Sequence, residues 1–439
     1  MMRIETSADE FSPIAGEPRK SGSNVKVARE QLRVAIVTSG LEFAGAEKQT
    51  FYIARALAEA GVRVRVYYIN NGGRYHGPLR SLQIESRWLG RWPSPVFRLP
   101  FLLASLRSFR PQVIQSIHAY TNLYSSIAGR VLGAVSVGGL RGDLKACFAD
   151  NGRFSRYLLT SPDAIAVNSR RAIEQIKQAR VADQSRLHFL PNVIDLDGYR
   201  ERSGPPDQDG DAECTCVCVS RLLPAKRVDV FVRALAAART TEPGLRGAVV
   251  GDGPETARLR ELAAELGLLP GTLDFLGFRE DIAGILQQAS MFVFCSESEG
   301  TPNVILEAMA ASLPVITTPA GDAADVVNPA GAGYVIPFGN VKETADAMVR
   351  LARSPALRSK LGRAGREYVT RHRATSELGE RLVRMYADVA RTSARGRRGN
   401  SFVLRAALDR FKLADDSNAT CSAACSEDAS DVFHVRGTA

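Results

Sequence analysis

The sequence predicts an α/β protein built from two parallel-sheet domains, and three observations lead to this fold class. The 439 residues exceed what one hydrophobic core accommodates, since cores stop growing near about 250–300 residues. Short apolar segments alternate with helical segments, as in a parallel sheet covered by helices on both faces. The alternation stops once, at 203–212, where Pro, Gly and Asp crowd together, and then restarts. We therefore expect an N-terminal domain over 31–202, a linker over 203–212, and a C-terminal domain over 213–391.

The N-terminal domain is predicted from short apolar or alternating runs that end at turn residues. These strand segments are 32–40, 62–69, 112–119, 164–169 and 187–192. A helix from about 46 to 60, closed by Gly61, connects the first two strands. Residues 1–30 contain Ser, Pro, Gly and charge without periodicity, so we expect them to be disordered.

The C-terminal domain repeats the same alternation. Its strand segments are 214–220, 246–252, 272–277, 291–296 and 314–318. Closing helices are expected from about 341 to 391, followed by a polar tail over 392–439 with one short helix at 402–413. Because ligands bind beyond the carboxyl ends of parallel strands, two such domains facing each other should enclose the site in a cleft.

Composition excludes several classes of protein. Hydrophobic residues make up 45% and charged residues 24%, which are values of a globular chain and not of a disordered or collagen-like one. No run of about 18 apolar residues predicts a membrane-spanning helix, and no apolar leader precedes the first domain, so a cytoplasmic location is expected. The seven cysteines are scattered, and Cys214, Cys216 and Cys218 alternate. They favour one face of a buried strand over a metal clip.

Positive charge is concentrated in the first half of the chain. The net charge is +10, and residues 1–210 hold 29 Lys and Arg against 19 Asp and Glu. The interval between Glu85 and Asp143 has no acidic residue, and aromatic residues are interleaved with its arginines. The arginines are Arg87, Arg91, Arg98, Arg107, Arg110, Arg130 and Arg141, and the aromatics are Trp88, Trp92, Phe97, Phe101 and Phe109. Such a surface suits an anionic membrane or a polyphosphate, whereas the alternative is a solvated helix face with its aromatics in the core. Nucleic acid ranks last, because no nucleic-acid-binding motif accompanies the charge.

Three candidate segments stand at strand-to-helix turns. In SGLEFAGAEKQ (39–49), Gly45 lets a ligand approach the backbone at a helix N-terminus, although an ordinary turn fits as well. In SRLLPAKR (220–227), Arg221 and Lys226 suit a diphosphate, and the alternative is two surface charges. In VVGDGPE (249–255), Gly251 and Gly253 shape either a nucleotide pocket or a common turn.

The fourth segment, SESEGTPNVILEAMA (296–310), carries the strongest signal. Thr301 is expected to cap a helix whose first turn contains Pro302, and the amides there would hold phosphate. Glu299 and Glu307 could each accept hydrogen bonds from sugar hydroxyls. If the ligand is a nucleotide diphosphate sugar, one carboxylate would bind its sugar and the other its ribose. Acid catalysis as in glycosidases is the rival interpretation of a carboxylate pair. A departing nucleoside diphosphate, however, requires cations and no proton donor.

Together these segments resemble the retaining nucleotide-sugar glycosyltransferases of the GT-B fold, glycosyltransferase family 4, over about 32–391. The resemblance implies two Rossmann-like domains that face each other across a cleft, with the C-terminal helices returning toward the N-terminal domain. Glu299 and Glu307 match the family's Glu-x7-Glu element, within EGTPNVILEAMA, and Arg221 and Lys226 match its Arg-x4-Lys clamp. GDGPE, PNVID (191–195) and AGAE (44–47) match too, the last resembling an acceptor-side loop. The resemblance implies donor contacts at Gly45, Gly251, Gly253, Gly300, Thr301, Pro302, Asn303 and Glu307, and catalytic roles for His118, Arg221, Lys226 and Glu299.

His118 illustrates what the resemblance adds. From the sequence alone, a histidine at the end of a strand is more often a core or surface residue. The resemblance places it next to the reacting sugar, where it would contact the donor or steer the acceptor without binding metal. Three positions depart from the family pattern: Ser220 and Val193 replace glycines, and Asp325 replaces a glutamate.

The function implied is transfer of a hexosyl-type sugar from a UDP- or GDP-sugar to an acceptor hydroxyl, with retention and without metal or cofactor. A lipid-linked or polysaccharide intermediate would be the acceptor, at the inner face of a membrane. DLD (195–197) and DQDGD (207–211) are interpreted as loops and not as a metal-binding Asp-x-Asp. Two alternatives remain: a nucleotide-sugar epimerase of the same architecture, and an inactive glycosyltransferase-like binding partner.

Overall fold

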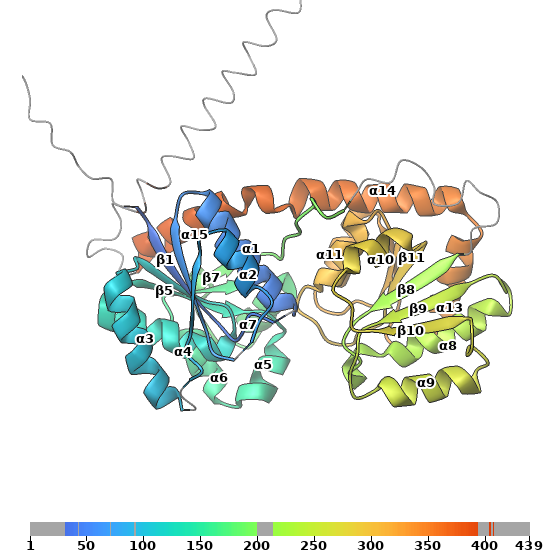
Figure 1. Ribbon diagram of the computed structural model, residues 1–439, viewed down its shortest axis with the longest axis horizontal. Helices are drawn as coiled ribbons and strands as arrows, with labels where there is room; N and C mark the ends of the chain where they lie inside the picture. Colours follow the sequence, from blue (N-terminus) through green and yellow to red (C-terminus); the bar gives the residue numbers. More distant parts are fainter. Residues whose placement is uncertain are drawn as a thin grey trace, which may run out of the picture. The chain divides into compact units, whose positions relative to one another are not determined.

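The computed structural model describes residues 31–42, 44–70, 72–91, 94–199 and 214–393, together with Leu404 and Ala407. These residues form two parallel sheets covered by helices, which confirms the predicted α/β class (Figure 1). The segment 1–30, the linker 203–212, and the tail beyond Ser393 lie outside the described residues. Leu404 and Ala407, within the helix expected at 402–413, are the exception, since both are helical and buried. The domain boundaries and the cleft remain predictions.

The N-terminal sheet has seven strands in the order β3-β2-β1-β4-β5-β6-β7, all parallel. The strands are β1 (Arg33–Thr38), β2 (Arg63–Tyr68), β3 (Glu85–Trp88), β4 (Val113–Ser116), β5 (Val135–Leu140), β6 (Ala164–Val167) and β7 (Leu187–Phe189). In the central strand β1 every residue after Arg33 is buried. A strand covered by helices on both faces requires such a continuous apolar run. The strand order reverses between β1 and β4, which is where open parallel sheets bind ligands.

Two strands of this sheet were not predicted. β3 lies at the edge of the sheet and has the sequence ESRW, in which an apolar pattern is absent. β5 contains Gly138 and Gly139, which weaken a strand signal. A side chain at Gly139 would overlap the carbonyl oxygen of Ile117. The glycine therefore allows the chain to pass close to the end of β4.

Helices cover both faces of the N-terminal sheet. One face carries α1 (Gly45–Glu59) and α2 (His76–Ser81). The other face carries α3 (Pro95–Phe109), α4 (Asn122–Leu132), α5 (Leu144–Asn151), α6 (Phe154–Thr160) and α7 (Arg170–Gln178). Short 3-10 helices are η1 (Ala119–Thr121) and η2 (Gln184–Arg186). Figure 1 shows α3, α4, α5 and α6 side by side as one layer.

The C-terminal sheet has six parallel strands in the order β10-β9-β8-β11-β12-β13. The strands are β8 (Thr215–Val219), β9 (Arg246–Val250), β10 (Leu273–Gly277), β11 (Met291–Phe294), β12 (Val315–Thr317) and β13 (Gly333–Val335). β13, a three-residue edge strand, was not predicted. Cys216 and Cys218 are buried on β8 in one hydrophobic cluster, as the alternation indicated.

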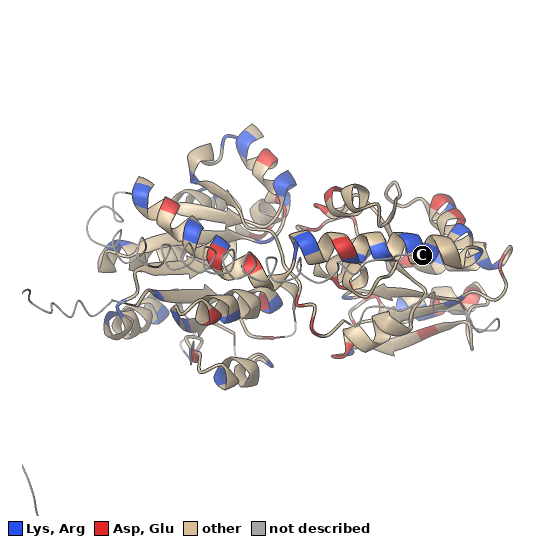
Figure 2. Ribbon diagram, turned by 90° about the horizontal axis from the view of Figure 1, so that it is seen from above, with Lys and Arg blue, Asp and Glu red and all other residues tan. Residues whose placement is uncertain are grey.

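The helices of this second sheet again divide between two clusters. η3 (Pro224–Lys226), α8 (Val228–Arg239), α9 (Thr256–Glu265) and α13 (Val341–Ala352) belong to one side. α10 (Ile282–Gln288), α11 (Asn303–Ala310) and α12 (Ala323–Ala330) belong to the other, where α14 (Pro355–His372) packs against α11 and α12. Seen from above, the helices on the upper side of Figure 1 carry Lys and Arg next to Asp and Glu (Figure 2).

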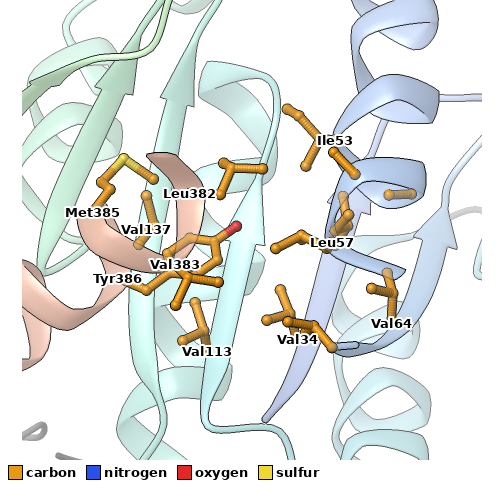
Figure 3. Close-up of a cluster of buried hydrophobic side chains, with 14 of the residues drawn as sticks. Val34, Ile53, Leu57, Val64, Val113, Val137, Leu382, Val383, Met385 and Tyr386 are labelled. Atoms are coloured by element: carbon orange, nitrogen blue, oxygen red, sulfur yellow. The ribbon is translucent and has the colours of Figure 1, made fainter. Parts of the chain in front are cut away.

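The last described helix returns to the N-terminal sheet. After η4 (Thr375–Glu377), α15 (Leu378–Thr392) lies against α1, β4 and β5 (Figure 3). Leu382, Val383 and Tyr386 are fully buried there, and the Tyr386 hydroxyl donates to the side-chain oxygen of Gln115 on β4. The closing helices therefore return toward the N-terminal domain, as the resemblance implied.

The chain passes between the two sheets twice, and the two passages are paired. Ile194 forms a parallel bridge with Ala374, and its amide donates to the carbonyl of Arg373 over 2.7 Å. Arg55 on α1 contacts both passages, through Asp195 Oδ2 at 2.5 Å and Thr375 Oγ1 at 3.2 Å. In the part of the chain that the structure describes, no helix has the length and apolar character needed to cross a bilayer.

Candidate functional site

The candidate residues stand at the carboxyl ends of parallel strands. His118 follows β4, and Gly45 follows β1. In the second sheet, Arg221 and Lys226 follow β8, and Glu299 follows β11. Because parallel strands end at the same edge of a sheet, the topology gathers each group at one edge.

Asn192 connects the loop before α11 to the N-terminal domain. Its amide nitrogen donates to the carbonyl of Thr301 over 2.8 Å and to Asn303 Oδ1 over 2.7 Å. Asn303 in turn donates from Nδ2 to the carbonyl of Gly45 over 2.8 Å. A β-carbon at Gly45 would lie 3.0 Å from Asn303 Nδ2, so this contact favours glycine. Gly45 and Asn303, predicted from distant segments, are therefore neighbours.

The prediction that Thr301 caps α11 is wrong. Pro302, in extended conformation, precedes the helix, and α11 begins at Asn303 without a side-chain cap. The buried Thr301 hydroxyl donates to the carbonyl of Asn168 over 2.8 Å. This carbonyl lies at the end of β6, so Thr301 joins the two domains. Gly300 lies next to Asn168 as well. A β-carbon at this position would lie 3.1 Å from Asn168 Oδ1, which is a tight contact.

Lys226 and Glu299 form an ion pair. Both side chains are largely buried, with exposed fractions of 15% and 16%. Lys226 ends η3 in the turn after β8, and Glu299 lies in the loop after β11, so the neighbouring strands β8 and β11 place them together. Arg221, at the start of the same turn, is exposed. In the predicted clamp, Lys226 is therefore paired with a carboxylate, whereas Arg221 is exposed.

Glu307 is paired with a lysine from the other domain. Lys48 Nζ on α1 lies 2.7 Å from Glu307 Oε1 on α11, and the Glu307 side chain is 5% exposed. Burial disfavours the charged ammonium, but the Glu307 carboxylate outweighs it, so the pKa of Lys48 is raised above its ordinary value. Lys48 lies in the AGAEKQ segment but was not predicted as a site residue, because nothing local indicates its partner.

His118 lies in a half-buried polar pocket at the end of β4. Its Nε2 is 3.3 Å from Ser39 Oγ and 3.7 Å from Glu47 Oε1, and the Ser39 hydroxyl donates to the same carboxylate over 2.5 Å. Burial lowers the pKa of His118, Glu47 opposes this shift, and Arg141 adds to it. The ring of Tyr120 stacks on the imidazole with centroids 5.8 Å apart. The pKa of His118 therefore lies below its ordinary value, and Glu47 is a neighbour that the sequence did not identify.

Gly251 and Gly253 bring two turns together. Gly251 has a φ of +128°, and a side chain there would overlap the carbonyl oxygen of Ser220. A side chain at Gly253 would overlap the carbonyl oxygen of Leu222. The turns after β8 and β9 therefore pack backbone to backbone, which only glycine permits. This packing places Arg221 beside the GDG turn.

Asp322 is a buried carboxylate that the sequence did not identify. It is 1% exposed and accepts hydrogen bonds from Ser169 Oγ at 2.6 Å and from the amide of Arg170 at 2.9 Å. Both donors belong to the N-terminus of α7 in the other domain. Asp325, which stands in the glutamate position of the family pattern, is exposed. The carboxylate that contacts the other domain is thus Asp322, three residues before Asp325.

Arg141 points toward the site as well. It donates to Asn192 Oδ1 over 2.8 Å, and burial lowers its pKa to about 10. It is therefore no part of the basic surface predicted for the interval from Glu85 to Asp143.

No group of three or more His, Cys, Asp or Glu side chains that could hold a metal ion occurs among the described residues. In the DLD segment, Asp195 is bound to Arg55, which agrees with a structural role for this loop. The DQDGD segment lies outside the described residues.

Two family models match the chain. The model described as glycosyl transferases group 1 matches residues 208–368, and the model described as glycosyltransferase family 4 matches residues 43–197. The first covers the second sheet with its helices, including Arg221, Lys226, Glu299 and Glu307. The second covers most of the first sheet, including Gly45 and His118.

Characterised relatives share parts of the sequence. An exopolysaccharide phosphotransferase of Streptomyces coelicolor is 32% identical over 49% of this chain and 22% of its own length. An N-acetyl-alpha-D-glucosaminyl L-malate synthase of Bacillus anthracis is 31% identical over 36% of this chain and 41% of its own. A GDP-mannose-dependent alpha-(1-6)-phosphatidylinositol monomannoside mannosyltransferase of Mycobacterium tuberculosis is 32% identical over 42% of this chain and 51% of its own. The matched regions thus span between about a fifth and a half of these relatives.

Solved structures show the same fold. HepE of Anabaena in complex with UDP superposes with a TM-score of 0.70 at 20% identity, over 81% of this chain and 99% of that chain. Sucrose-phosphate synthase of Thermosynechococcus elongatus gives a TM-score of 0.67 at 19% identity, over 83% and 100%.

Proposed function

The chain belongs to the group 1 glycosyltransferases of family 4, and from this premise we propose that it transfers a hexosyl-type sugar from a nucleotide diphosphate sugar to an acceptor hydroxyl, with retention of configuration. The donor is a UDP- or GDP-sugar. This agrees with the UDP-glucose complex of HepE and with the GDP-mannose dependence in the name of the mycobacterial relative.

The contact between Lys226 and Glu299 carries this proposal. A nucleotide sugar places an anionic diphosphate directly beside a ring of hydroxyl groups. A site for it requires a cation next to a hydrogen-bond acceptor. The structure brings these two groups together from neighbouring strands at the N-terminus of α11. The first amides of that helix add further donors for phosphate oxygens.

In the proposed reaction, Lys226 and Arg221 stabilise the charge that develops on the departing diphosphate. Glu299 accepts hydrogen bonds from the sugar, and Glu307 accepts them from the ribose. The Glu307 carboxylate is at the same time paired with Lys48. The neutral His118 contacts the reacting sugar or the acceptor as a hydrogen-bonding group. Gly251 and Gly253 let the nucleotide approach the backbone.

We further propose that the reaction needs no metal and no cofactor, because Arg221, Lys226 and the helix amides supply positive charge where the diphosphate departs. The acceptor is a lipid-linked or polysaccharide intermediate on the cytoplasmic side of a membrane. The relatives described above include exopolysaccharide and phosphatidylinositol mannoside enzymes, which supports this class of acceptor.

Donor turnover in the presence of EDTA tests the proposal. The full chain is incubated with a panel of UDP- and GDP-sugars, with and without a lipid-linked acceptor pool, and the anomeric configuration of the product is read by NMR. Lys226→Ala should reduce turnover about 100- to 1,000-fold, because it removes a preorganised charge from the transition state. Lys360→Ala, an exposed lysine on α14, is the matched control and should leave turnover unchanged.

Four outcomes would contradict the proposal. If Lys226→Ala turns over the donor as fast as the unaltered chain does, the assignment of Lys226 to a phosphate clamp is wrong. Loss of activity in EDTA would show that the reaction requires a metal ion. Conversion of the donor without any acceptor into an isomeric nucleotide sugar would identify an epimerase, and binding of donors without turnover would identify an inactive partner.

A further inference from the structure

On one face of the N-terminal sheet, three helices carry basic side chains and no acidic ones, whereas α5 and α7 on the same face each carry one acidic residue, Asp150 and Glu174. α3, α4 and α6 contain no Asp or Glu. Their exposed basic residues are joined by others in the adjoining loops and on α5. The exposed members are Arg107, Arg110, Arg130, Lys145, Arg153 and Arg156. On the opposite side of this sheet, α1 and α15 carry both signs of charge, and Figure 2 shows them intermixed.

The same layer exposes large apolar side chains. Phe97 and Phe101 on α3 are 59% and 43% exposed, and Phe154 and Tyr157 on α6 are 54% and 41% exposed. Tyr120 of η1 is 39% exposed. Of the nine exposed large hydrophobic residues among the described ones, these five and Val131 of α4 belong to this layer. Single exposed hydrophobics are ordinary, but a gathering on one side of a sheet indicates an interaction surface.

These aromatics lie at the edge of the sheet that carries the candidate site. α3 follows β3, so its first turns, with Phe97 and Phe101, begin at the carboxyl edge. α6 packs against η1, whose Tyr120 stacks on His118. Phe154 and Tyr157 form one aromatic pair, with ring centroids 5.4 Å apart. We call Phe97, Phe101, Tyr120, Phe154 and Tyr157 the aromatic rim.

The structure changes which residues form this surface. Arg87 is engaged with Glu85 and Ser105 on the sheet, and Phe109 is buried beneath Arg65. Trp88 donates from its indole to the carbonyl of Ile69 over 3.0 Å. Of these residues of the acid-free interval, Phe109 is buried, and Arg87 and Trp88 are half-buried and engaged by neighbouring groups. α6, outside that interval, supplies the exposed Arg153, Phe154, Arg156 and Tyr157. Trp92 lies outside the described residues.

We propose that the aromatic rim and its basic neighbours dock onto an anionic lipid bilayer. Aromatic side chains with a polar partner nearby are suited to the boundary between headgroups and acyl chains, and arginines are attracted to anionic headgroups. A nucleic acid would be bound by charge along a groove and by stacked bases, whereas here the aromatics stand on a layer of packed helices. The position beside His118 places the site at the lipid surface, and to this extent the inference rests on the proposed lipid-linked acceptor.

Vesicle co-sedimentation of the full chain tests the inference without donor or turnover. We expect binding to vesicles of phosphatidylcholine mixed with phosphatidylglycerol, no binding to phosphatidylcholine alone, and weakening by salt. Arg107→Ser, Arg153→Ser and Arg156→Ser together should weaken binding about 100-fold. Phe97→Ser with Phe154→Ser should weaken it too, without removing charge.

The matched control removes three charges elsewhere. Lys360→Ser, Arg363→Ser and Arg371→Ser lie exposed on α14 and should leave vesicle binding unchanged. Equal loss in this control, or equal binding to neutral vesicles, would overturn the inference. Rim-dependent binding of heparin without any vesicle binding would assign the surface to a soluble polyanion and overturn it as well. Because Lys226→Ala should bind vesicles normally, a failure of the docking surface is distinguishable from a failure of the proposed reaction.

Discussion

The surroundings of His118 predict an effect on the pH dependence of protein stability. Its imidazole is half-buried between Ser39, Glu47 and Tyr120, and its Nδ1 has no hydrogen-bond partner in the described part of the chain. Burial outweighs the attraction of Glu47, so the folded protein holds the ring neutral at a pH where the unfolded chain would protonate it.

Stability should therefore fall with acidification at this residue. A histidine whose folded pKa lies below its unfolded value of about 6.5 contributes fully above that pH and loses its contribution as the pH falls through the window below it. We expect His118→Gln to flatten the decline of unfolding free energy between neutral and mildly acidic pH, measured by denaturant titration, and to reduce donor turnover.

His188 on β7 supplies the matched comparison. Burial lowers the pKa of His188 as well, and it lies on the edge strand of the sheet. His188→Gln should flatten the same curve while leaving donor turnover unchanged. If both variants affect turnover equally, His118 acts only through stability and its proposed contact with the substrate is wrong.

At this scale the sequence identifies residues but not their partners. Lys226, Glu299 and Glu307 stand in motifs whose spacing is visible in the sequence. Lys48 and Asp322 stand in no such pattern, because each meets a partner more than 150 residues away. The importance of such residues depends on how the two sheets are joined, which local spacing does not encode.

Asp322 shows how one element stabilises another across the two domains. Ser169 is the N-cap of helix α7 and accepts from the amide of Ala172 over 3.1 Å, while Asp322 accepts from the amides of Arg170 and Arg171. A carboxylate at this position also interacts favourably with the positive end of the helix dipole. The first turn of α7 is thus capped by a residue of the C-terminal domain.

Asp322→Ala should lower the free energy of unfolding by about 1–3 kcal/mol, because charged acceptors are removed from buried donors. Thermal unfolding measures the loss, and hydrogen exchange should accelerate at the first amides of α7. Asp325→Ala removes an exposed carboxylate three residues away and should change stability by less than about 0.5 kcal/mol. Similar losses in both variants would show that the cap is unimportant.

The elements themselves were largely predictable where hydrophobic periodicity is strong. The missed strands are those in which this signal is weak: β3 is polar, β5 contains two glycines, and β13 has three residues. The start of α11 was misplaced by the preference of threonine for helix caps, which a buried carbonyl acceptor at Asn168 overrode.

For the whole molecule, α15 is a structural part of the N-terminal domain. Leu382 is fully buried in the cluster formed by β1, α1 and β4. Leu382→Ala should cost about 2–5 kcal/mol, because a cavity opens in a packed core. Arg384→Ala, on the exposed side of the same helix, should cost less than about 0.5 kcal/mol. Denaturant unfolding compares the two, and equal small effects would mean that α15 is dispensable for this core.

The two-domain architecture follows from chain length and from the break in alternation, so it was predictable. The docking of α15 was implied by the family resemblance and by no pattern in the helix itself. The charge asymmetry can be counted in the sequence, but the sequence does not show which of the basic side chains are engaged by neighbouring groups. Arg87 and Arg141 donate to Ser105 and Asn192, whereas Arg153 and Arg156 are exposed.

The position of α15 has a consequence for synthesis on the ribosome. Domains generally fold as they emerge, N-terminal part first. Here the strands of the first sheet, residues 33–189, emerge early, but one of their faces is completed by residues 378–390 and by Leu404 and Ala407. The second sheet, with α8 to α14, is finished before that face is covered. The half of the chain that is translated first therefore completes its core last, and until then its apolar face is available to chaperones.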